Sequence, residues 1–551
     1  MFPCSIKAGP EWSRPIPSSR LRPFTLAVLG ALVLPACAVE DPAPAESPEP
    51  ELGMVEFPTS CSAEAQPHLE RGLLMLHHMM YPQAEGAFTE AAALEQNCAM
   101  AQWGLAMAHF QPFWGSADVE AGRAHAEQAL ALDPPTEREQ LYVQAALAFF
   151  EEPDASYAGR LRSWEAAMEE LHEVFPEDPE AATLFALAHI SVGPDDPDRL
   201  ARAGSIVEEI HTAQPDHPGA VHYAIHVHDV EGLADEGVRF ARAYEEVAPS
   251  IPHALHMPSH IYVRTGAWDE VIDWNRRSAD AALEHPAGEN ISLHYPHALD
   301  YLMYGHLQRG EDEAASEILE ELRSREGYQA HLASGYALAA IPARWHVERR
   351  DWAGAAGLEP GEPAEFDWDR YPAAEAMTWF ARGLGSARTG DTEGARQAQD
   401  RLAALEESLR QAEDTYWARR VEIQRLSVAA WEALAMGDPD SAESRMRTAA
   451  ELEGSMEKHA ITPGELQPAY ELLGDLLLEL DRPAEALEAY EKSLEMWPRR
   501  YHTLLGAARA ADGLAEEEVA LGYYGELLEL AAGANPDRDG LAEARQRVAT
   551  R

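Results

Sequence analysis

The sequence predicts an all-α fold, a solenoid built from antiparallel helix pairs. Three observations support this prediction. From residue 61 onward, long segments rich in Ala, Leu and Glu are interrupted by Gly, Asp and Pro, the residues that end helices. No segment alternates apolar and polar residues as a half-buried strand would. Helix-pair signatures recur at intervals close to 34 residues, a period typical of helical repeat arrays.

The clearest repeat lies near the C-terminus and reads LLGDLLLELDRPAEALEAYEKSLEMWP over residues 472–498. Gly474, Ala486, Tyr490 and Pro498 have the spacing of the tetratricopeptide motif, in which small residues let two helices pack closely and a proline ends the unit. The sequence therefore predicts a tetratricopeptide-repeat superhelical solenoid, in which each helix pair buries its apolar face against its neighbours.

The same pattern returns 34 residues later, at Ala520 and Tyr524, so residues 461–551 are expected to form regular C-terminal repeats. Residues 61–460 are expected to form a more degenerate part of the same solenoid. Weaker second-helix signatures there include Ala84, Phe88 and Ala91; Gly237, Ala241 and Tyr244; Val271, Asn275 and Ser278; Ala315, Leu319 and Leu322; and Ala442, Met446 and Ala449.

The N-terminal region has the layout of a bacterial export signal. Arg20 and Arg22 precede an apolar stretch, FTLAVLGALVL, that is too short to be a stable membrane anchor. It ends in LPAC, which resembles a lipobox, so residues 1–36 are predicted to be a lipoprotein signal peptide and Cys37 the lipidated residue. The alternative is an ordinary cleaved signal with an incidental cysteine. Two acyl signals would hold the protein firmly on a membrane of the bacterial cell envelope, either the outer membrane facing the periplasm or the cell surface.

A tether and a cysteine pair follow this leader. Residues 37–60 are rich in Pro and acidic residues and are expected to form an extended tether. Cys61 and Cys98 then remain as an even pair in an oxidising compartment, which predicts a disulfide. Service as metal ligands is the weaker alternative, because neither cysteine belongs to a CxxC motif.

The charge balance argues against a nucleic-acid partner. The chain of 551 residues has a formal net charge of −52, with 43 Lys and Arg against 95 Asp and Glu. Such a surface repels phosphate backbones and offers no basic stripe to them. We therefore expect no nucleic-acid binding.

Histidines concentrate in one region of the predicted solenoid. The run HALHMPSHIYVRTGAWDEV begins at His253 and places His256 and His260 one turn apart. Counted in the tetratricopeptide register, His253, His256 and His260 fall at positions 2, 5 and 9 of a first helix, which face the groove. Pro258 lies among them and removes one helix hydrogen bond, so a kink is expected there.

The repeats on either side contribute to the same groove. His222 and His226 occupy positions 5 and 9 one repeat earlier, and His297 and Asp300 occupy positions 2 and 5 one repeat later. Asp229, Tyr304 and Arg344 are expected to face the groove beside them, the first two as residues that orient a ligand.

These residues suggest two kinds of site. Neutral imidazoles and a carboxylate are ligands for zinc, copper or iron, so His222, His226, His253, His256, His260, His297 and Asp300 form a candidate transition-metal site. The alternative is a polar groove that binds a peptide or responds to pH. His77, His78 and His109 lie among apolar residues and are interpreted as core or rim residues.

Four segments read CAMAQWGLAM, HPGAVHYAIHVHD, PHALHMPSHIYVRTGAWDEVIDWN and ARTGD, and the HxxHMPSH run is the most specific part of them. Together they resemble a group of bacterial exported tetratricopeptide-repeat proteins, mostly of unassigned activity. The resemblance covers most of the chain from Cys61 to about Asp391. It implies the fold and an exported setting, and it supplies no reaction.

We therefore expect an exported, lipid-anchored scaffold that binds a peptide or protein partner in its concave groove and carries a His/Asp metal cluster there. A metal-dependent enzyme that uses the same cluster is the alternative.

Overall fold

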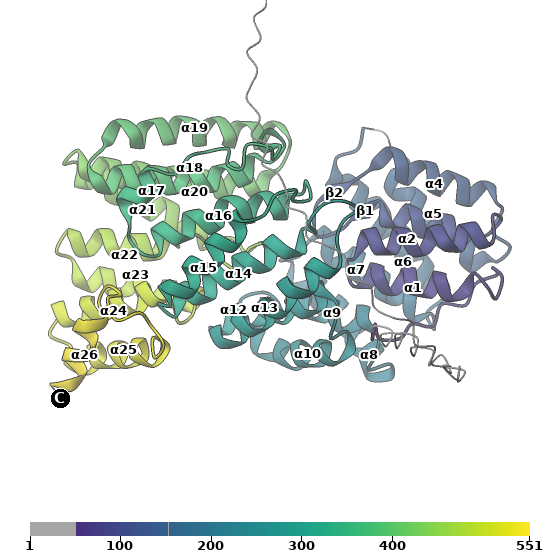
Figure 1. Cartoon of the computed structure of the whole chain (residues 1–551), viewed down its shortest axis with the longest axis horizontal. Helices are drawn as coiled ribbons and strands as arrows, with labels where there is room; N and C mark the ends of the chain where they lie inside the picture. The colour runs from purple at the N-terminus through teal and green to yellow at the C-terminus, as the bar shows by residue number, and fades with distance from the viewer. Residues whose placement is uncertain (1–50, 153, 551) are drawn as a thin grey trace, which may run out of the picture. The chain divides into compact units, whose positions relative to one another are not determined.

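The structure is a computed structural model that describes residues 51–152 and 154–550 (Figure 1). The expected signal peptide, the lipidation site Cys37 and residues 37–50 of the expected tether lie outside the described residues.

The described chain is almost entirely helical. Its first half contains α1 Gln66–His77, α2 Tyr81–Leu94, α3 Ala99–Ala108, β1 Phe110–Gln111, β2 Ser116–Ala117, α4 Val119–Ala131, α5 Glu137–Phe150, α6 Tyr157–Val174, α7 Pro179–Val192, α8 Pro197–Ala213, α9 Pro218–His228, α10 Ala234–Val247, α11 Pro252–His256, α12 Pro258–Thr265 and α13 Trp268–Glu284. Its second half contains α14 His294–Gln308, α15 Asp312–Arg323, α16 Leu332–Val347, α17 Trp352–Ala356, the 3₁₀ helix η1 Trp368–Arg370, α18 Pro372–Thr389, α19 Thr392–Gln411, α20 Thr415–Ala435, α21 Pro439–Glu453, α22 Ala469–Glu479, α23 Pro483–Met496, α24 Tyr501–Gly513, α25 Glu517–Leu530 and α26 Leu541–Ala549.

The helix boundaries follow from local sequence chemistry. Asp178 and Asp196 precede α7 and α8, and each side chain accepts hydrogen bonds from two free N–H groups of the helix that follows, with a proline at the first helical position. Gly266 and Gly390 end α12 and α18 in the left-handed conformation, which a glycine adopts without a steric penalty.

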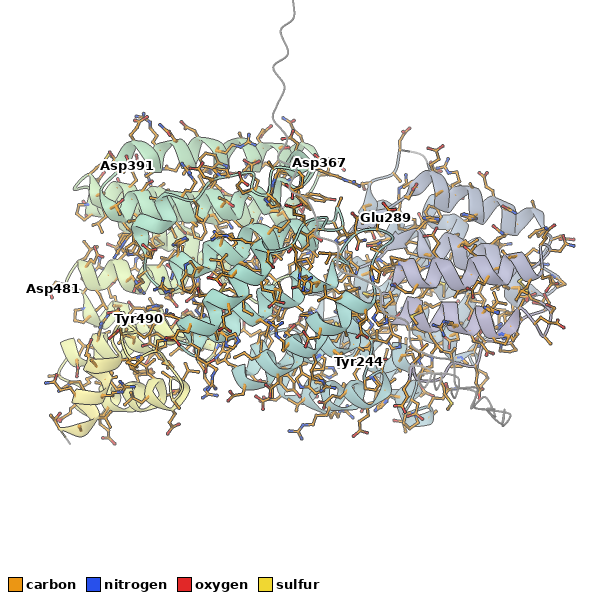
Figure 2. The ribbon with its side chains drawn as sticks, viewed as in Figure 1. Tyr244, Glu289, Asp367, Asp391, Asp481 and Tyr490 are labelled. Atoms are coloured by element: carbon orange, nitrogen blue, oxygen red, sulfur yellow. A yellow bond between two sulfur atoms is a disulfide. The ribbon has the colours of Figure 1, made fainter. Side chains whose placement is uncertain are left out.

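Successive helices pack on one another in antiparallel pairs along the described chain, from α1 on α2 to α25 on α26. Close packing depends on small residues facing large ones. Tyr490, labelled in Figure 2, lies against Gly474 and Gly506, and a Cβ atom at either glycine would come within 2.6 or 2.3 Å of its ring atoms. This arrangement confirms the predicted all-α solenoid of helix pairs.

Pro258 interrupts the histidine-bearing helix as expected. α11 ends at His256 and α12 begins at Pro258, with Met257 between them. The His260 N–H bonds to the Met257 carbonyl three residues back, at 3.1 Å. Pro258 itself has no N–H to donate to the Ala254 carbonyl, so the α-helical pattern breaks there.

Within residues 51–152 and 154–550, no helix is both long enough and apolar enough to cross a membrane.

A disulfide joins Cys61 to Cys98, with their Cα atoms 5.3 Å apart and a sequence separation of 37. It links the segment before α1 to the start of α3. Bonded sulfurs are not thiolate ligands, so these two cysteines do not form a metal site in this state.

The double substitution Cys61→Ser and Cys98→Ser is expected to lower the free energy of unfolding by about 3–4 kcal/mol, because the open chain gains loop entropy. Urea unfolding of the oxidised wild type and the variant measures the difference. A reductant should destabilise the wild type by a similar amount and leave the variant unchanged. Equal unfolding midpoints for oxidised wild type and variant would contradict this expectation.

Candidate functional site

Six buried histidines form two groups of three, which we call the α12 triad and the α9 triad. The α12 triad consists of His256, His260 and His297, and one ring nitrogen of each lies within 4.8 Å of the others. The His256 and His260 Nε2 atoms are 3.0 Å apart. The His297 ring packs on His256 with ring centroids 4.3 Å apart, and within the described chain its Nε2 has no hydrogen-bond partner.

The tautomers of two α12-triad histidines are fixed by the groups bound to their other nitrogens. His260 Nδ1 donates to a carboxylate oxygen of Asp229 at 2.9 Å. His256 Nδ1 lies 2.7 Å from Asn275 Oδ1. The Asn275 amide nitrogen donates to Ser259 Oγ and the Val271 carbonyl, so its oxygen is left to accept from His256. In the neutral rings both facing Nε2 atoms therefore carry lone pairs and no proton.

The α9 triad consists of His222, His226 and His253. His222 Nδ1 donates to the His77 carbonyl at 2.6 Å, which leaves the His222 Nε2 lone pair free. The Nε2 atoms of His226 and His253 each lie 3.1 Å from that nitrogen. Tyr244, labelled in Figure 2, stacks on the His222 ring with ring centroids 5.4 Å apart.

Burial keeps these imidazoles neutral. It is the largest cause that lowers the pKa of His222, to about 3, and it holds the pKa values of His226, His253, His256 and His297 well below 6.5. Burial also lowers the pKa of His260, although its hydrogen bond to Asp229 opposes this. Histidine binds metal ions in its neutral form, and these rings have that form near pH 7.

Asp229 is the charged anchor behind the α12 triad. Besides His260, it accepts from the Lys458 ammonium at 2.8 Å and from Arg264 Nε at 2.9 Å. Burial alone would raise the pKa of Asp229, but Lys458 and Arg264 beside it hold that pKa well below its usual range. The carboxylate is therefore ionised and acts as a hydrogen-bond acceptor that orients His260.

Two segments of the chain itself cover the triads. The turn between β1 and β2 places Phe113 on the His226 ring at 4.1 Å between centroids and Trp114 within 5.8 Å of the His253 ring. The second segment, residues 454–468 between α21 and α22, we call the strap. Its Lys458 bonds to Asp229.

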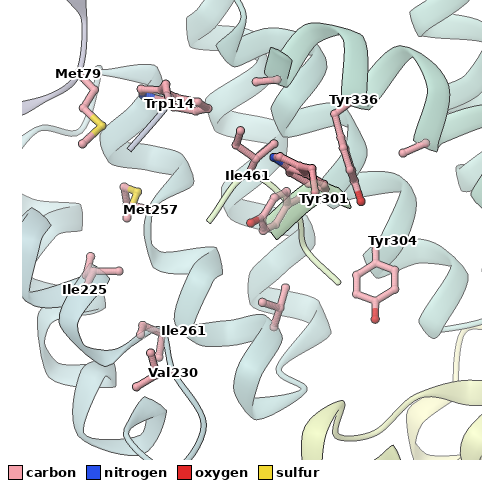
Figure 3. Packing of buried hydrophobic residues seen from close by; sticks show 14 of the residues in the cluster. Met79, Trp114, Ile225, Val230, Met257, Ile261, Tyr301, Tyr304, Tyr336 and Ile461 are labelled. Carbon is pink, nitrogen blue, oxygen red and sulfur yellow. The ribbon is translucent and has the colours of Figure 1, made fainter. Parts of the chain in front are cut away.

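A small cavity of about 10 Å³ remains at the junction of the two triads, about the space of one water molecule. It is lined by His226 and His253 from the α9 triad, His260 from the α12 triad, and Met79, Phe113, Trp114, Ala460 and Ile461. Figure 3 shows Met79, Trp114 and Ile461 in the apolar packing around this region. Apolar side chains therefore line this cavity together with the three histidines.

Arg344 and Asp300 pair with each other outside both triads. Arg344 Nε donates to Asp300 at 2.8 Å, and its other nitrogens donate to the carbonyls of Gly464 at 2.7 Å and Glu465 at 2.9 Å in the strap. Both side chains are fully buried. Arg344 thus binds a carboxylate of the protein itself, and the Asp300 Oδ1 atom, expected as a metal ligand, is occupied by this ion pair.

Tyr304 also lies apart from the triads. Its hydroxyl accepts from Arg500 at 2.6 Å, and Arg500 in turn bonds to Glu348 and Glu471. Its ring contacts the Arg344 guanidinium at 4.7 Å. Tyr304 therefore supports the strap anchor.

A third acid–base group, His77, Glu180 and His217, is a closed hydrogen-bond network. The two histidine Nε2 atoms bind separate oxygens of Glu180, at 2.8 and 3.0 Å. Their Nδ1 atoms bond to the Tyr223 hydroxyl and to the Ala220 N–H. Every ring nitrogen has a partner, so this group ties α1 to α7 and α9, in keeping with the core interpretation of His77.

Sequence reasoning missed several residues of the site. Lys458, Phe113 and Trp114 orient or cover the histidines from elements distant in sequence, and Asn275 orients His256 from α13, the helix that follows α12. His294 and His331 also lie near Trp114, with ring centroids 6.2 and 5.4 Å away. Only Asn275 carried a signal, because it falls in the second-helix signature that follows the HxxHMPSH run.

No family model matches the chain, and no curated protein does. Among solved structures, a similar one is described as "Human IFIT1 dimer with PPP-AAAA"; it is 12% identical, with a TM-score of 0.37, and the alignment covers 86% of this chain and 96% of that chain. So low a TM-score carries no argument about this protein, and the ligand in that description belongs to that protein.

Proposed function

We propose that the protein is a metal-binding helical-repeat scaffold whose α12 triad holds a transition-metal ion. One observation carries this proposal: His256 and His260 present their Nε2 atoms to each other at 3.0 Å while both Nδ1 atoms donate elsewhere. Two facing lone pairs repel in an apolar interior unless a cation lies between them.

The distances suit a metal ion. Nitrogens bound at about 2.1 Å to one ion lie about 3.0–3.4 Å apart, depending on coordination geometry. His297 offers a third nitrogen that has no other partner among the described residues. Asp229 and Asn275 bind the outward nitrogens, as the groups behind metal-bound histidines commonly do.

The alternative cation is a proton shared by His256 and His260. Burial opposes the imidazolium that this would create. The Asp229 carboxylate beside His260 is already paired with two cations, Lys458 and Arg264. A metal ion forms strong bonds to both rings and to His297, whereas a proton can join only two nitrogens.

For the cellular location of this scaffold we keep the proposal made from the sequence. The Arg20 to Cys37 pattern supports a lipid-anchored protein of the bacterial cell envelope. A peptide or protein partner would bind inner helix faces away from the triads, because Phe113, Trp114 and the strap fill the space over them.

A metal-dependent enzyme is the second candidate, favoured by the cavity of about 10 Å³ beside His260. A bound ion with one open coordination position could hold a water-sized ligand there.

Metal analysis of the purified full-length chain tests the proposal. After reconstitution with zinc, copper or iron and removal of excess metal, we expect at least one tightly bound ion per chain. His256→Ala should lose one ion. His306→Ala is the matched control, because His306 lies on α14 with His297 but bonds to Glu311 at 2.8 Å. A metal-free wild type under all three conditions would overturn the proposal.

A further inference from the structure

The α9 triad repeats the design of the α12 triad one helix away. His222 Nε2 has a single in-plane lone pair, freed by the bond from Nδ1 to the His77 carbonyl. Two further Nε2 atoms, those of His226 and His253, approach it at 3.1 Å. One lone pair can accept from one of them, so hydrogen bonding leaves the other contact unsatisfied.

His253 shows the same deficit on its other side. Within the described chain its Nδ1 is buried without a hydrogen-bond partner. A neutral histidine carries its proton on one of its two nitrogens, so His253 either buries an unpaired N–H or donates the proton to His222. A cation among the three Nε2 atoms satisfies these three facing nitrogens together, and it places the His253 proton on Nδ1, which has no partner within the described chain.

The two triads are neighbours within one histidine cluster. The rings of His226 and His260 lie 5.8 Å apart between centroids, and those of His253 and His256 lie 6.1 Å apart. The α9 triad takes two histidines from α9 and one from α11. The α12 triad takes one histidine each from α11, α12 and α14. The small cavity touches both triads, so a water-sized ligand there would be shared between two ions.

The ligand set indicates which metal. All six ligands are neutral imidazoles, and no carboxylate or thiolate belongs to either triad. Two divalent ions would bring four positive charges into a buried apolar site, whereas two cuprous ions bring two, and the cost of burying charge rises steeply with its amount. Imidazole nitrogens are also among the ligands that suit copper.

We propose that the two triads together form a paired copper site, with one ion on His222, His226 and His253 and a second on His256, His260 and His297. This inference rests on the proposed function of the α12 triad, and it adds a second ion and the identity of the metal.

Anaerobic titration of the metal-free full-length protein with Cu(I), against a coloured Cu(I) chelator as competitor, tests the inference. We expect two tightly held ions per wild-type chain and one each in His222→Ala and His256→Ala. His228→Ala is the matched control for α9, because His228 bonds to the Ala224 carbonyl at 2.7 Å and belongs to neither triad; it should hold two.

The outcomes separate the two proposals. One ion in the wild type, lost in His256→Ala and kept in His222→Ala, overturns the pair and leaves the α12 site in place. No bound Cu(I) in this titration and no bound zinc, copper or iron in the reconstitution described above overturn both. Tightly bound zinc in that reconstitution, with no Cu(I) bound in this titration, overturns the copper assignment.

X-ray absorption spectroscopy of the copper-loaded wild type tests the same inference without depending on the folding of a variant. It should show about three imidazole nitrogens near 2 Å around the average copper ion. Sulfur or carboxylate ligands in that shell would contradict the assignment.

Discussion

Lowering the pH of the metal-free protein from 7 toward 4 is expected to unfold it cooperatively. Burial lowers the pKa of five histidines to values far under the unfolded value of 6.5. They are His78 and His331, to about 4, and His222, His294 and His459, to about 3.

The direction of this pH effect follows from the number of protons that the folded and unfolded chains bind. Below pH 6.5 these histidines are protonated in the unfolded chain, whereas in the folded chain they stay neutral until the pH approaches 3–4. The folded state therefore loses stability as the pH falls from 6.5 toward 3–4. Above pH 6.5 these groups are neutral in both states and contribute no pH dependence. Each group removes about 1.4 kcal/mol per pH unit, or about 7 kcal/mol for five, against a typical total of about 5–15 kcal/mol.

Far-UV circular dichroism against pH measures this effect. The midpoint of unfolding is expected roughly one to two pH units below 6.5, and no change is expected between pH 7 and 9. Bound metal should shift the midpoint to lower pH, because protons then compete with the ion for the same nitrogens. A helical signal unchanged down to pH 4 in the metal-free protein would contradict the burial of neutral histidines.

The substitution Arg344→Met is expected to destabilise the protein by about 3–5 kcal/mol, the cost of removing one partner of a buried ion pair. Asp300 would be left as a buried carboxylate without its cation, and the Gly464 and Glu465 carbonyls would lose their donors. Because these carbonyls belong to the strap, residues 454–468 should also become more susceptible to proteolysis.

Urea unfolding and limited proteolysis measure the two effects. The double variant Asp300→Asn with Arg344→Met should recover part of the lost stability, because the unpaired charge is gone while the strap anchor is still missing. A single variant as stable as the wild type would show that the ion pair does not hold the strap.

The repeat pattern made the fold predictable, because its signals are local. Gly474 and Tyr490 meet across one helix pair, and Asp178 caps the helix that follows it, so each can be recognised from a short window. Histidines with the same helical register, such as His256 and His260, could likewise be assigned to one face from their spacing alone.

The division of the histidines into two triads could not be predicted, because it depends on long-range packing. Lys458 reaches Asp229 from a segment 229 residues away in sequence, and the β1–β2 turn brings Trp114 beside His253. Asp300 was expected beside the histidines from its register position, but its Oδ1 atom is bound by Arg344, a partner on the next inner helix. A register assigns a residue to a face, and the neighbouring helices determine its partner.

The most direct measurement is element-specific anomalous diffraction from crystals of the metal-loaded protein. The account predicts a peak about 2.0–2.1 Å from the Nε2 atoms of His256 and His260, with His297 as the third ligand. No peak at the α12 triad, in crystals that contain bound metal elsewhere or none at all, would contradict it.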